Sequence, residues 1–280
     1  MNSKKFMEMR PTLFLLLAVL LFSCGKKTGR KAVESEHASR IKLAAYNVEY
    51  SKNASAAEIG KALKGYNFDV VCFSEAPGGD WTKEVGSVMG LNHIVVGKYS
   101  TAGHEDKYKT IASRTSLFNP EEVLMADTLH TATRVKTKIN DIEFTIYAVH
   151  FPFGWRDQAH IDETTNKVQT FVDYLKERQN KELAVVAGDF NFIPINKDSI
   201  NAYHKMFMDI NLDVHWKELG IDCTKRNTYN ALAPEDEGNG EVIDHIMYNP
   251  LKMKVLDGDI IEMEKPLSDH KPVWALLEVK

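Results

Sequence analysis

Cysteine and clustered positive charge are both scarce in this sequence. The 280 residues include three cysteines, and Cys72 and Cys223 alone are too few for a disulfide framework. Cys72 lies inside an apolar run, so we expect it to be a small core residue. The formal net charge is −4, and no block of Lys and Arg is present. This balance lacks the usual electrostatic footprint of nucleic-acid-binding proteins, although a metal can bring phosphate to an acidic chain.

The sequence also contains no internal repeat, no low-complexity segment and no apolar run beyond residue 23 that is long enough to span a bilayer. The composition is 44% hydrophobic and 26% charged, which is ordinary for a globular protein with one large core. We therefore predict one folded domain, residues 41–280.

The N-terminus has the layout of an export signal. Lys4, Lys5 and Arg10 precede the apolar run 13–22, which is too short to cross a membrane. Residues 21–25, Leu-Phe-Ser-Cys-Gly, resemble the lipobox of bacterial lipoproteins. That resemblance implies a signal peptide over 1–23, lipidation of Cys24, and a flexible tether over 24–40. The protein would then be a membrane-anchored lipoprotein of the cell envelope, outside the cytoplasm. A plain secretory signal with an incidental cysteine is the alternative.

The hydrophobic pattern predicts many strands and few long helices. The run Leu-Ala-Val-Val-Ala at 183–187 is typical of a strand that is buried on both faces. Further strands are expected at 41–50, 69–76, 93–99, 110–114, 129–138, 142–151, 241–248 and 272–279. Helices are expected at 54–67, 82–89, 157–178 and 196–208. Several strands that are apolar on both faces indicate two packed sheets flanked by helices.

Two polar side chains follow the strand at 183–187. Asp189 and Asn191 come after Gly188 at a spacing of two, which in an extended segment sends both side chains to one side. A carboxylate and an amide in that position could orient a water beside an anion and donate a hydrogen bond to it. An Asx turn that simply closes the strand is the alternative.

Other strand ends carry residues of the same chemical kind, namely Asn47, Glu75, His150, Asp244, Asp269 and His270. Each one alone has a structural explanation, as a turn former, a satisfied buried histidine or a hydrogen-bond acceptor. Their repetition at the ends of apolar runs favours one shared site. His245 follows Asp244 and must point to the opposite face of its strand, so we interpret it as structural.

These segments, in this order, resemble the endonuclease/exonuclease/phosphatase superfamily of metal-dependent phosphoesterases. The most specific pieces are Gly-Asp-Phe-Asn at 188–191 and Ser-Asp-His-Lys-Pro-Val at 268–273. The resemblance implies an α/β fold, a four-layer α/β/β/α sandwich with two mostly antiparallel sheets. It also implies a Mg²⁺-dependent phosphoester hydrolase, with Mn²⁺ as a second candidate metal. Together with the export signal, this predicts an extracytoplasmic enzyme, which we expect to be a monomer.

The resemblance further implies roles for individual residues. Glu75, assisted by Asn47 and Asp269, would bind the metal, whose preferred ligands are oxygens. Asp189 would orient and deprotonate the attacking water. Asn191 would hydrogen-bond the phosphate or the nucleophile. His270, oriented by Asp244, would contact the scissile phosphate, and His150 would be a second imidazole on the phosphate.

The substrate class stays open at this point. A histidine at position 150 looks more like pancreatic-type DNases, neutral sphingomyelinases and inositol-polyphosphate phosphatases than like abasic-site nucleases. Nucleic acid, phospholipid head groups and small soluble phosphoesters are therefore all candidate substrates, with diester and monoester cleavage both open. The competing hypothesis is a non-catalytic surface lipoprotein that binds a phosphorylated ligand or a glycan on the same scaffold.

Overall fold

The structure is a computed structural model that describes residues 39–153, 158–192, 195–196, 199–200, 202–232 and 241–280. All of these residues fall in one compact unit, Glu36–Lys280. The predicted signal peptide, Cys24 and nearly all of the predicted tether lie outside the described residues, so the division of the chain into leader, tether and domain stays a prediction. No helix in the described ranges is long and apolar enough to cross a membrane.

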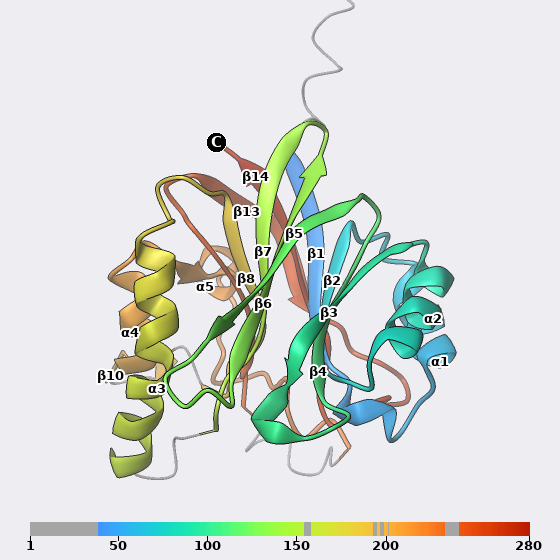
Figure 1. Ribbon diagram of the computed structural model, residues 1–280, viewed down its shortest axis with the longest axis horizontal. Helices are drawn as coiled ribbons and strands as arrows, with labels where there is room; N and C mark the ends of the chain where they lie inside the picture. The colour runs from blue at the N-terminus through green and yellow to red at the C-terminus, as the bar shows by residue number, and fades with distance from the viewer. Residues whose placement is uncertain (1–38, 154–157, 193–194, 197–198, 201, 233–240) are drawn as a thin grey trace, which may run out of the picture. The chain divides into compact units, whose positions relative to one another are not determined.

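Two six-stranded sheets form the centre of this unit (Figure 1). The first has the order β13-β14-β1-β2-β4-β3 and the second the order β11-β12-β8-β7-β6-β5. The strands of the first sheet are β1 (Arg40–Asn47), β2 (Val70–Ala76), β3 (His93–Ser100), β4 (Tyr108–Ser113), β13 (Met253–Ile260) and β14 (Val273–Val279). Those of the second are β5 (Leu117–Leu124), β6 (Thr131–Ile139), β7 (Ile142–His150), β8 (Ala184–Asp189), β11 (Asp213–Val214) and β12 (Asp244–Tyr248).

Helices cover the outer faces of the sheets. In Figure 1, α1 and α2 lie on the side of the first sheet, and α3 and α4 lie on the side of the second. The helices are α1 (Ala56–Lys64), α2 (Gly79–Met89), α3 (Gln158–Lys176), α4 (Ala202–Met208) and α5 (His215–Leu219), with 3₁₀ turns at Glu49–Ser51 and Thr101–Gly103 and a small ribbon of β9 (Ile195–Asn196) and β10 (Ser199–Ile200). The predicted fold class, two mostly antiparallel sheets flanked by helices, is confirmed.

Strand β1 shows why the apolar runs are continuous. Leu43 and Ala45 belong to the large hydrophobic cluster that contains residues of both sheets. Ala44 and Tyr46 alternate with them and belong to the cluster beneath α1 and α2. Because successive side chains of a strand point to opposite faces, a strand covered on both sides must be apolar at every position.

Several element predictions were wrong. The predicted helix at 196–208 begins only at Ala202, after β9 and β10, and the predicted strand at 41–50 ends at Asn47. Strands β5 and β13 were not predicted. Both are edge strands with a register shift, and β5 contains Pro120 within its shift. Proline and acidic residues are unfavourable in a central strand but are tolerated at a sheet edge, so their presence did not exclude a strand here.

Candidate active site

Each sheet contains one parallel strand pair, and these pairs bring the polar strand ends together. β1 pairs with β2 so that Asn47 lies opposite Ser74, one residue before Glu75. β7 pairs with β8 so that His150 lies opposite Asp189. Parallel strands end at the same edge of a sheet. The two central pairs therefore deliver two polar side chains each to one end of the double-sheet core.

The turn after β8 decides between the two interpretations of Asp189 and Asn191, an extended segment and an Asx turn. Gly188 has φ +151°, and a Cβ there would lie 2.0 Å from the carbonyl oxygen of Val149, so only glycine fits. Asn191 is in the left-handed region, with φ +52°, and its backbone N–H donates to Asp189 Oδ1 at 2.9 Å. The segment is thus an Asx turn and not the extended segment that we expected, and both side chains nevertheless line the same cleft.

Asp189 Oδ2 is the point on which the site converges. Asn47 Nδ2 donates to it at 3.0 Å, while Nε2 of His150 lies 3.5 Å away and Nε2 of His270 lies 3.7 Å away. Asp189 is 1% exposed. Burial raises the pKa of this carboxyl above its usual range, and the nearby Asp244 acts in the same direction, against the opposing effect of His270. The carboxyl is therefore poised to exchange a proton closer to neutral pH than an exposed aspartate.

His270 lies between two carboxylates from neighbouring strands. Asp244 on β12 pairs directly with Asp189 on β8, and Nδ1 of His270 lies 2.8 Å from Asp244 Oδ2. Burial opposes a charge on the imidazole, but Asp244 and Asp189 outweigh it and raise the pKa of His270 to about 10. Asp244 therefore orients the ring and favours its protonated form.

His150 has different surroundings. Its Nδ1 is buried and has no hydrogen-bond partner within the part of the chain that the structure describes. Burial, reinforced by Lys109 and His270, lowers its pKa well below the usual range. The site thus contains one imidazole that favours the charged form and one that favours the neutral form.

The three predicted metal ligands lie at the ends of β1 and β2 and before β14. Glu75 and Asp269 supply carboxylates and Asn47 supplies an amide, which are oxygen donors of the kind that Mg²⁺ prefers. Burial raises the pKa of Asp269, and Glu49 and Glu75 add to this effect against His270. Lys107 Nζ lies 2.6 Å from Glu75 Oε2, so a cation already contacts one of these carboxylates. The donor set and the accumulation of negative charge both fit a divalent ion.

A different group also brings candidate ligand atoms together. Asp189, Asp244 and His270 each offer one atom within 4.8 Å of the others. Asp244 Oδ2 and His270 Nδ1 are, however, already joined by a hydrogen bond of 2.8 Å. We therefore interpret this group as a hydrogen-bonded network, and Glu75, Asn47 and Asp269 as the better match to a hard metal ion.

A cleft of about 440 Å³ contains all of the predicted catalytic and metal-binding residues except Asp244. Asp244 is fully buried and contacts the cleft residue His270 at 2.8 Å. The cleft is lined by Asn47, Glu75, His150, Phe153, Asp189, Asn191, Tyr229, Asn230, Glu241, Ile243, Asp269 and His270. Four of these lining residues are Asp or Glu and none is Lys or Arg, counting described residues only. This accumulation of carboxylates fits the binding of a cation, which would offset their charge beside a phosphate.

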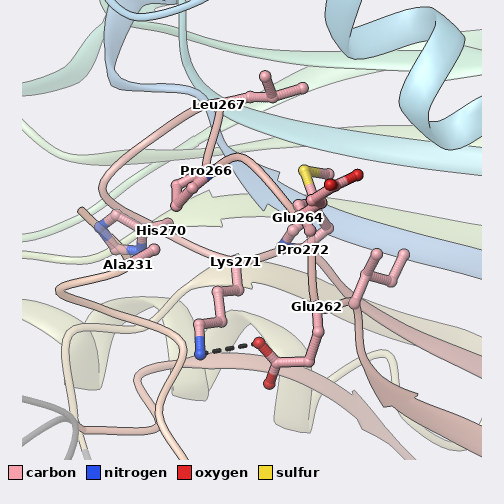
Figure 2. Close-up of a pocket in the computed structure, with 10 residues that line it drawn as sticks. Ala231, Glu262, Glu264, Pro266, Leu267, His270, Lys271 and Pro272 are labelled. Atoms are coloured by element: carbon pink, nitrogen blue, oxygen red, sulfur yellow. Dashed lines mark ion pairs between the residues drawn. The ribbon is translucent and has the colours of Figure 1, made fainter. Parts of the chain in front are cut away.

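A second hollow, of about 170 Å³, shares His270 as a wall (Figure 2). Its other lining residues are mostly apolar, and Lys271 and Glu262 form an ion pair of 2.9 Å beside it. It contains no other predicted site residue. The polar cleft, and not this apolar hollow, is therefore the candidate active site.

Three further residues support the site, and two of them, Ser268 and Thr228, were not predicted from the sequence. Ser268 Oγ donates to the carbonyl of Asn47 at 2.8 Å and thereby connects the end of β1 to the Asp269–His270 segment. Thr228 Oγ1 accepts from the N–H of Asp244 at 3.1 Å. Tyr229 packs its ring 5.1 Å from that of His270. Ser268 stands inside the Ser-Asp-His motif and could have been found there, whereas Thr228 lies in a loop and gave no local signal.

His245 occupies the opposite face of β12, as predicted. It accepts a hydrogen bond from Trp216 Nε1 at 3.0 Å, and its Nε2 lies 2.8 Å from the carbonyl of Phe192. Burial lowers its pKa to about 3. Trp216 is itself buried, so this pair belongs to the core.

Known proteins share this fold and its sequence pattern. The Endonuclease/Exonuclease/phosphatase family matches residues 44–270. No curated protein matches the chain. An endonuclease/exonuclease/phosphatase from Beutenbergia cavernae has a TM-score of 0.68 at 16% identity, over 86% of this chain and 72% of its own.

Two further solved structures are similar in fold. The human Nocturnin catalytic domain with bound sulfate anion has a TM-score of 0.65 at 18% identity, over 86% of this chain and 95% of its own. D. rerio TDP2 complexed with single strand DNA product has a TM-score of 0.63 at 14% identity, over 86% and 99%. The matched residues include most of the described domain and the candidate site, and the chain belongs to the endonuclease/exonuclease/phosphatase family.

Proposed function

We propose that this protein is a divalent-metal-dependent hydrolase that cleaves phosphodiester bonds. The observation that carries the proposal is the arrangement around Asp189 Oδ2, where Asn47, His150 and His270 all direct nitrogen atoms at one buried carboxylate oxygen within 3.7 Å. Family membership supports the coarse reaction class, because members of this family hydrolyse phosphoesters.

Glu75, Asn47 and Asp269 would hold Mg²⁺, with Mn²⁺ as the alternative. When bound, the ion would polarise a phosphate oxygen and offset the negative charge that develops on it. The carboxylates supply the ligands and Ser268 holds the two ligand-bearing segments together.

Asp189 would accept the proton of the attacking water. A general base acts best when its pKa lies near the working pH, and burial moves the pKa of Asp189 in that direction. The Asn47 amide and the Asn191 backbone N–H hold its two oxygens in place. Asp189 is thus a base with a fixed orientation.

His270 would donate a hydrogen bond to the phosphate from Nε2, while Asp244 holds Nδ1. A positioned, charged donor stabilises the developing negative charge, and the loss of one such donor commonly lowers the rate by about 10²–10³. Neutral His150, which also faces the reacting region, would assist at the phosphate or the leaving group. Asn191 would contact the nucleophile or the phosphate.

Three substrate classes satisfy this chemistry, namely nucleic acid, phospholipid head groups and small soluble phosphodiesters. Nucleic acid has the support of the D. rerio TDP2 structure with its single-strand DNA product. The lining of the cleft supports a short contact around one phosphate, because its described residues include no Lys or Arg that could follow an extended polyanion.

We also propose that the protein works outside the cytoplasm as a monomer anchored through a lipid on Cys24. The support is the signal-like sequence at 1–23 and the lipobox-like residues around Cys24. Metabolic labelling with a radioactive fatty acid tests this. The wild type should be labelled and Cys24→Ser should not, and equal labelling of both would contradict the anchor.

A substrate panel tests the enzymatic proposal. Purified protein with Mg²⁺ or Mn²⁺ should hydrolyse at least one of plasmid DNA, RNA, sphingomyelin, phosphoinositides and bis-p-nitrophenyl phosphate. EDTA should abolish that hydrolysis, and added Mg²⁺ should restore it. Tight binding of a phosphorylated ligand or glycan with no turnover across the panel would overturn the proposal in favour of a binding protein.

A further inference from the structure

Lys107 makes close contact with a predicted metal ligand. Its Nζ lies 2.6 Å from Glu75 Oε2, and both side chains are largely buried, with 21% and 14% exposed. The same ammonium lies 4.9 Å from the centroid of the Tyr50 ring, within range of a cation–π contact. The carbonyl of Lys107 accepts a hydrogen bond from the N–H of Thr101 at 2.7 Å. The ammonium is therefore positioned by the fold and is not a loose surface charge.

Glu75 has an unusual backbone conformation that directs it to this contact. Its φ is +50°, and the register of β2 with β4 shifts between Phe73 and Ala76. A bulge of this kind redirects a side chain away from the regular ladder and is common beside functional sites. Apart from the Lys107 contact on Oε2, Glu75 Oε1 lies 3.8 Å from His150 Nε2, an imidazole that favours the neutral form. Lys107 is therefore the main positive partner of Glu75 within the described residues.

We infer that Lys107 is an internal counter-ion that competes with the divalent metal for Glu75. This inference rests on the proposed function in one respect, the assignment of Glu75 as a metal ligand. One carboxylate oxygen cannot keep an ammonium at 2.6 Å and bind a divalent ion at full strength, because the two cations repel each other. Lys107 thus stabilises the acidic cleft without metal and weakens its affinity for metal.

The competing explanation is an ordinary ion pair at the rim of the cleft. Partly exposed pairs contribute little to stability, and the loss of such a pair would leave metal affinity unchanged. The two explanations therefore differ in metal affinity, which can be measured without any substrate.

Isothermal titration calorimetry with Mn²⁺ on the full-length protein separates them. The test variant is Lys107→Met, and Lys107→Gln repeats it with a polar side chain. Lys98→Met is the matched control, because Lys98 is exposed and its ammonium also lies over a ring, that of Tyr99 at 5.1 Å. Each variant removes one positive charge, so general charge effects cancel.

We expect Lys107→Met and Lys107→Gln to bind Mn²⁺ about fivefold to tenfold more tightly than the wild type. In both variants Glu75 is released from its ion pair, and no ammonium repels the metal. Lys98→Met should stay within about twofold of the wild type. Equal or weaker binding by both Lys107 variants would overturn the inference, even if the wild type binds metal and hydrolyses phosphodiesters. Absence of Mn²⁺ binding by the wild type would overturn the metal assignment and the inference together.

Discussion

A buried histidine lies at each face of β12, and the surroundings of the two rings shift their pKa values in opposite directions. On the cleft face, Asp244 contacts His270, whose ring lies between the carboxylates of Asp244 and Asp189. On the opposite face, His245 lies among the rings of Phe190, Phe192 and Trp216, and its hydrogen bonds within the described residues go to two neutral groups. His270 is 6% exposed and His245 is fully buried. The pKa is raised to about 10 in the first and lowered to about 3 in the second.

This comparison shows that burial does not identify a functional histidine. Desolvation disfavours the charged form of both rings. The difference comes from the groups that face each ring, carboxylates in the cleft and aromatic rings in the core. Because Asp244 and His245 are adjacent in one strand, the alternation of side chains assigns them to opposite faces. Substitutions on the cleft face should therefore change turnover, and substitutions on the opposite face should change stability.

The largest difference is expected from His270→Ala. Removal of this charged donor should lower kcat by about 10³-fold, while the far-ultraviolet circular dichroism spectrum stays that of the wild type. Initial rates on the best substrate of the panel, at saturating Mg²⁺, provide the measurement. A variant that keeps more than a tenth of wild-type activity would contradict a catalytic role for His270.

Asp244→Asn should have the next largest effect on the cleft face. The amide keeps the shape of the side chain but no longer stabilises the protonated ring of His270, and it can favour the wrong tautomer. We expect kcat to fall by about 10²-fold with little change in KM. Steady-state kinetics check this, and a loss confined to KM would instead assign Asp244 to substrate binding.

His245→Gln should act on stability and not on catalysis. The change disturbs the hydrogen bonds of the ring with Trp216 and Phe192 inside the aromatic core. We expect the free energy of unfolding to fall by about 2 kcal/mol, with kcat of the folded protein within about threefold of the wild type. Urea denaturation and initial rates on the same preparation measure both. A rate loss comparable to that of His270→Ala would show that the two faces are not separate.

The acid side of the stability profile should depend on His245. Its pKa in the folded state, about 3, lies below the value of about 6.5 expected for an unfolded chain. Neutral His245 therefore contributes stability that is present above pH 6.5 and is lost as the pH falls from 6.5 towards 3. In His245→Gln, the free energy of unfolding that is lost between neutral pH and pH 3 to 4 should be smaller than in the wild type, by on the order of a few kcal/mol. Urea denaturation at several pH values measures it, and parallel profiles would contradict this account.

The sequence allowed prediction of the fold class and of the residues that the cleft brings together, for a physical reason. A strand buried on both faces is apolar throughout, so a polar residue at its end stands out, as Asp189 and His150 do. Their roles stay predictions, since proximity alone does not assign a role. The Lys107–Glu75 pair could not be predicted, because it depends on a bulge in β2 and on the loop before β4. The Thr228–Tyr229 segment contacts His270 across more than forty residues of sequence, a separation at which no local pattern is informative.

If the cleft hydrolyses phosphodiesters as proposed, Asp189 is the base that activates the water. The most direct measurement compares kcat of the wild type and Asp189→Asn on one phosphodiester, with Mn²⁺ affinity and thermal unfolding measured on the same preparations. The account predicts a loss of about 10³-fold or more in kcat, with Mn²⁺ binding and folding retained. Turnover by Asp189→Asn within tenfold of the wild type would contradict it.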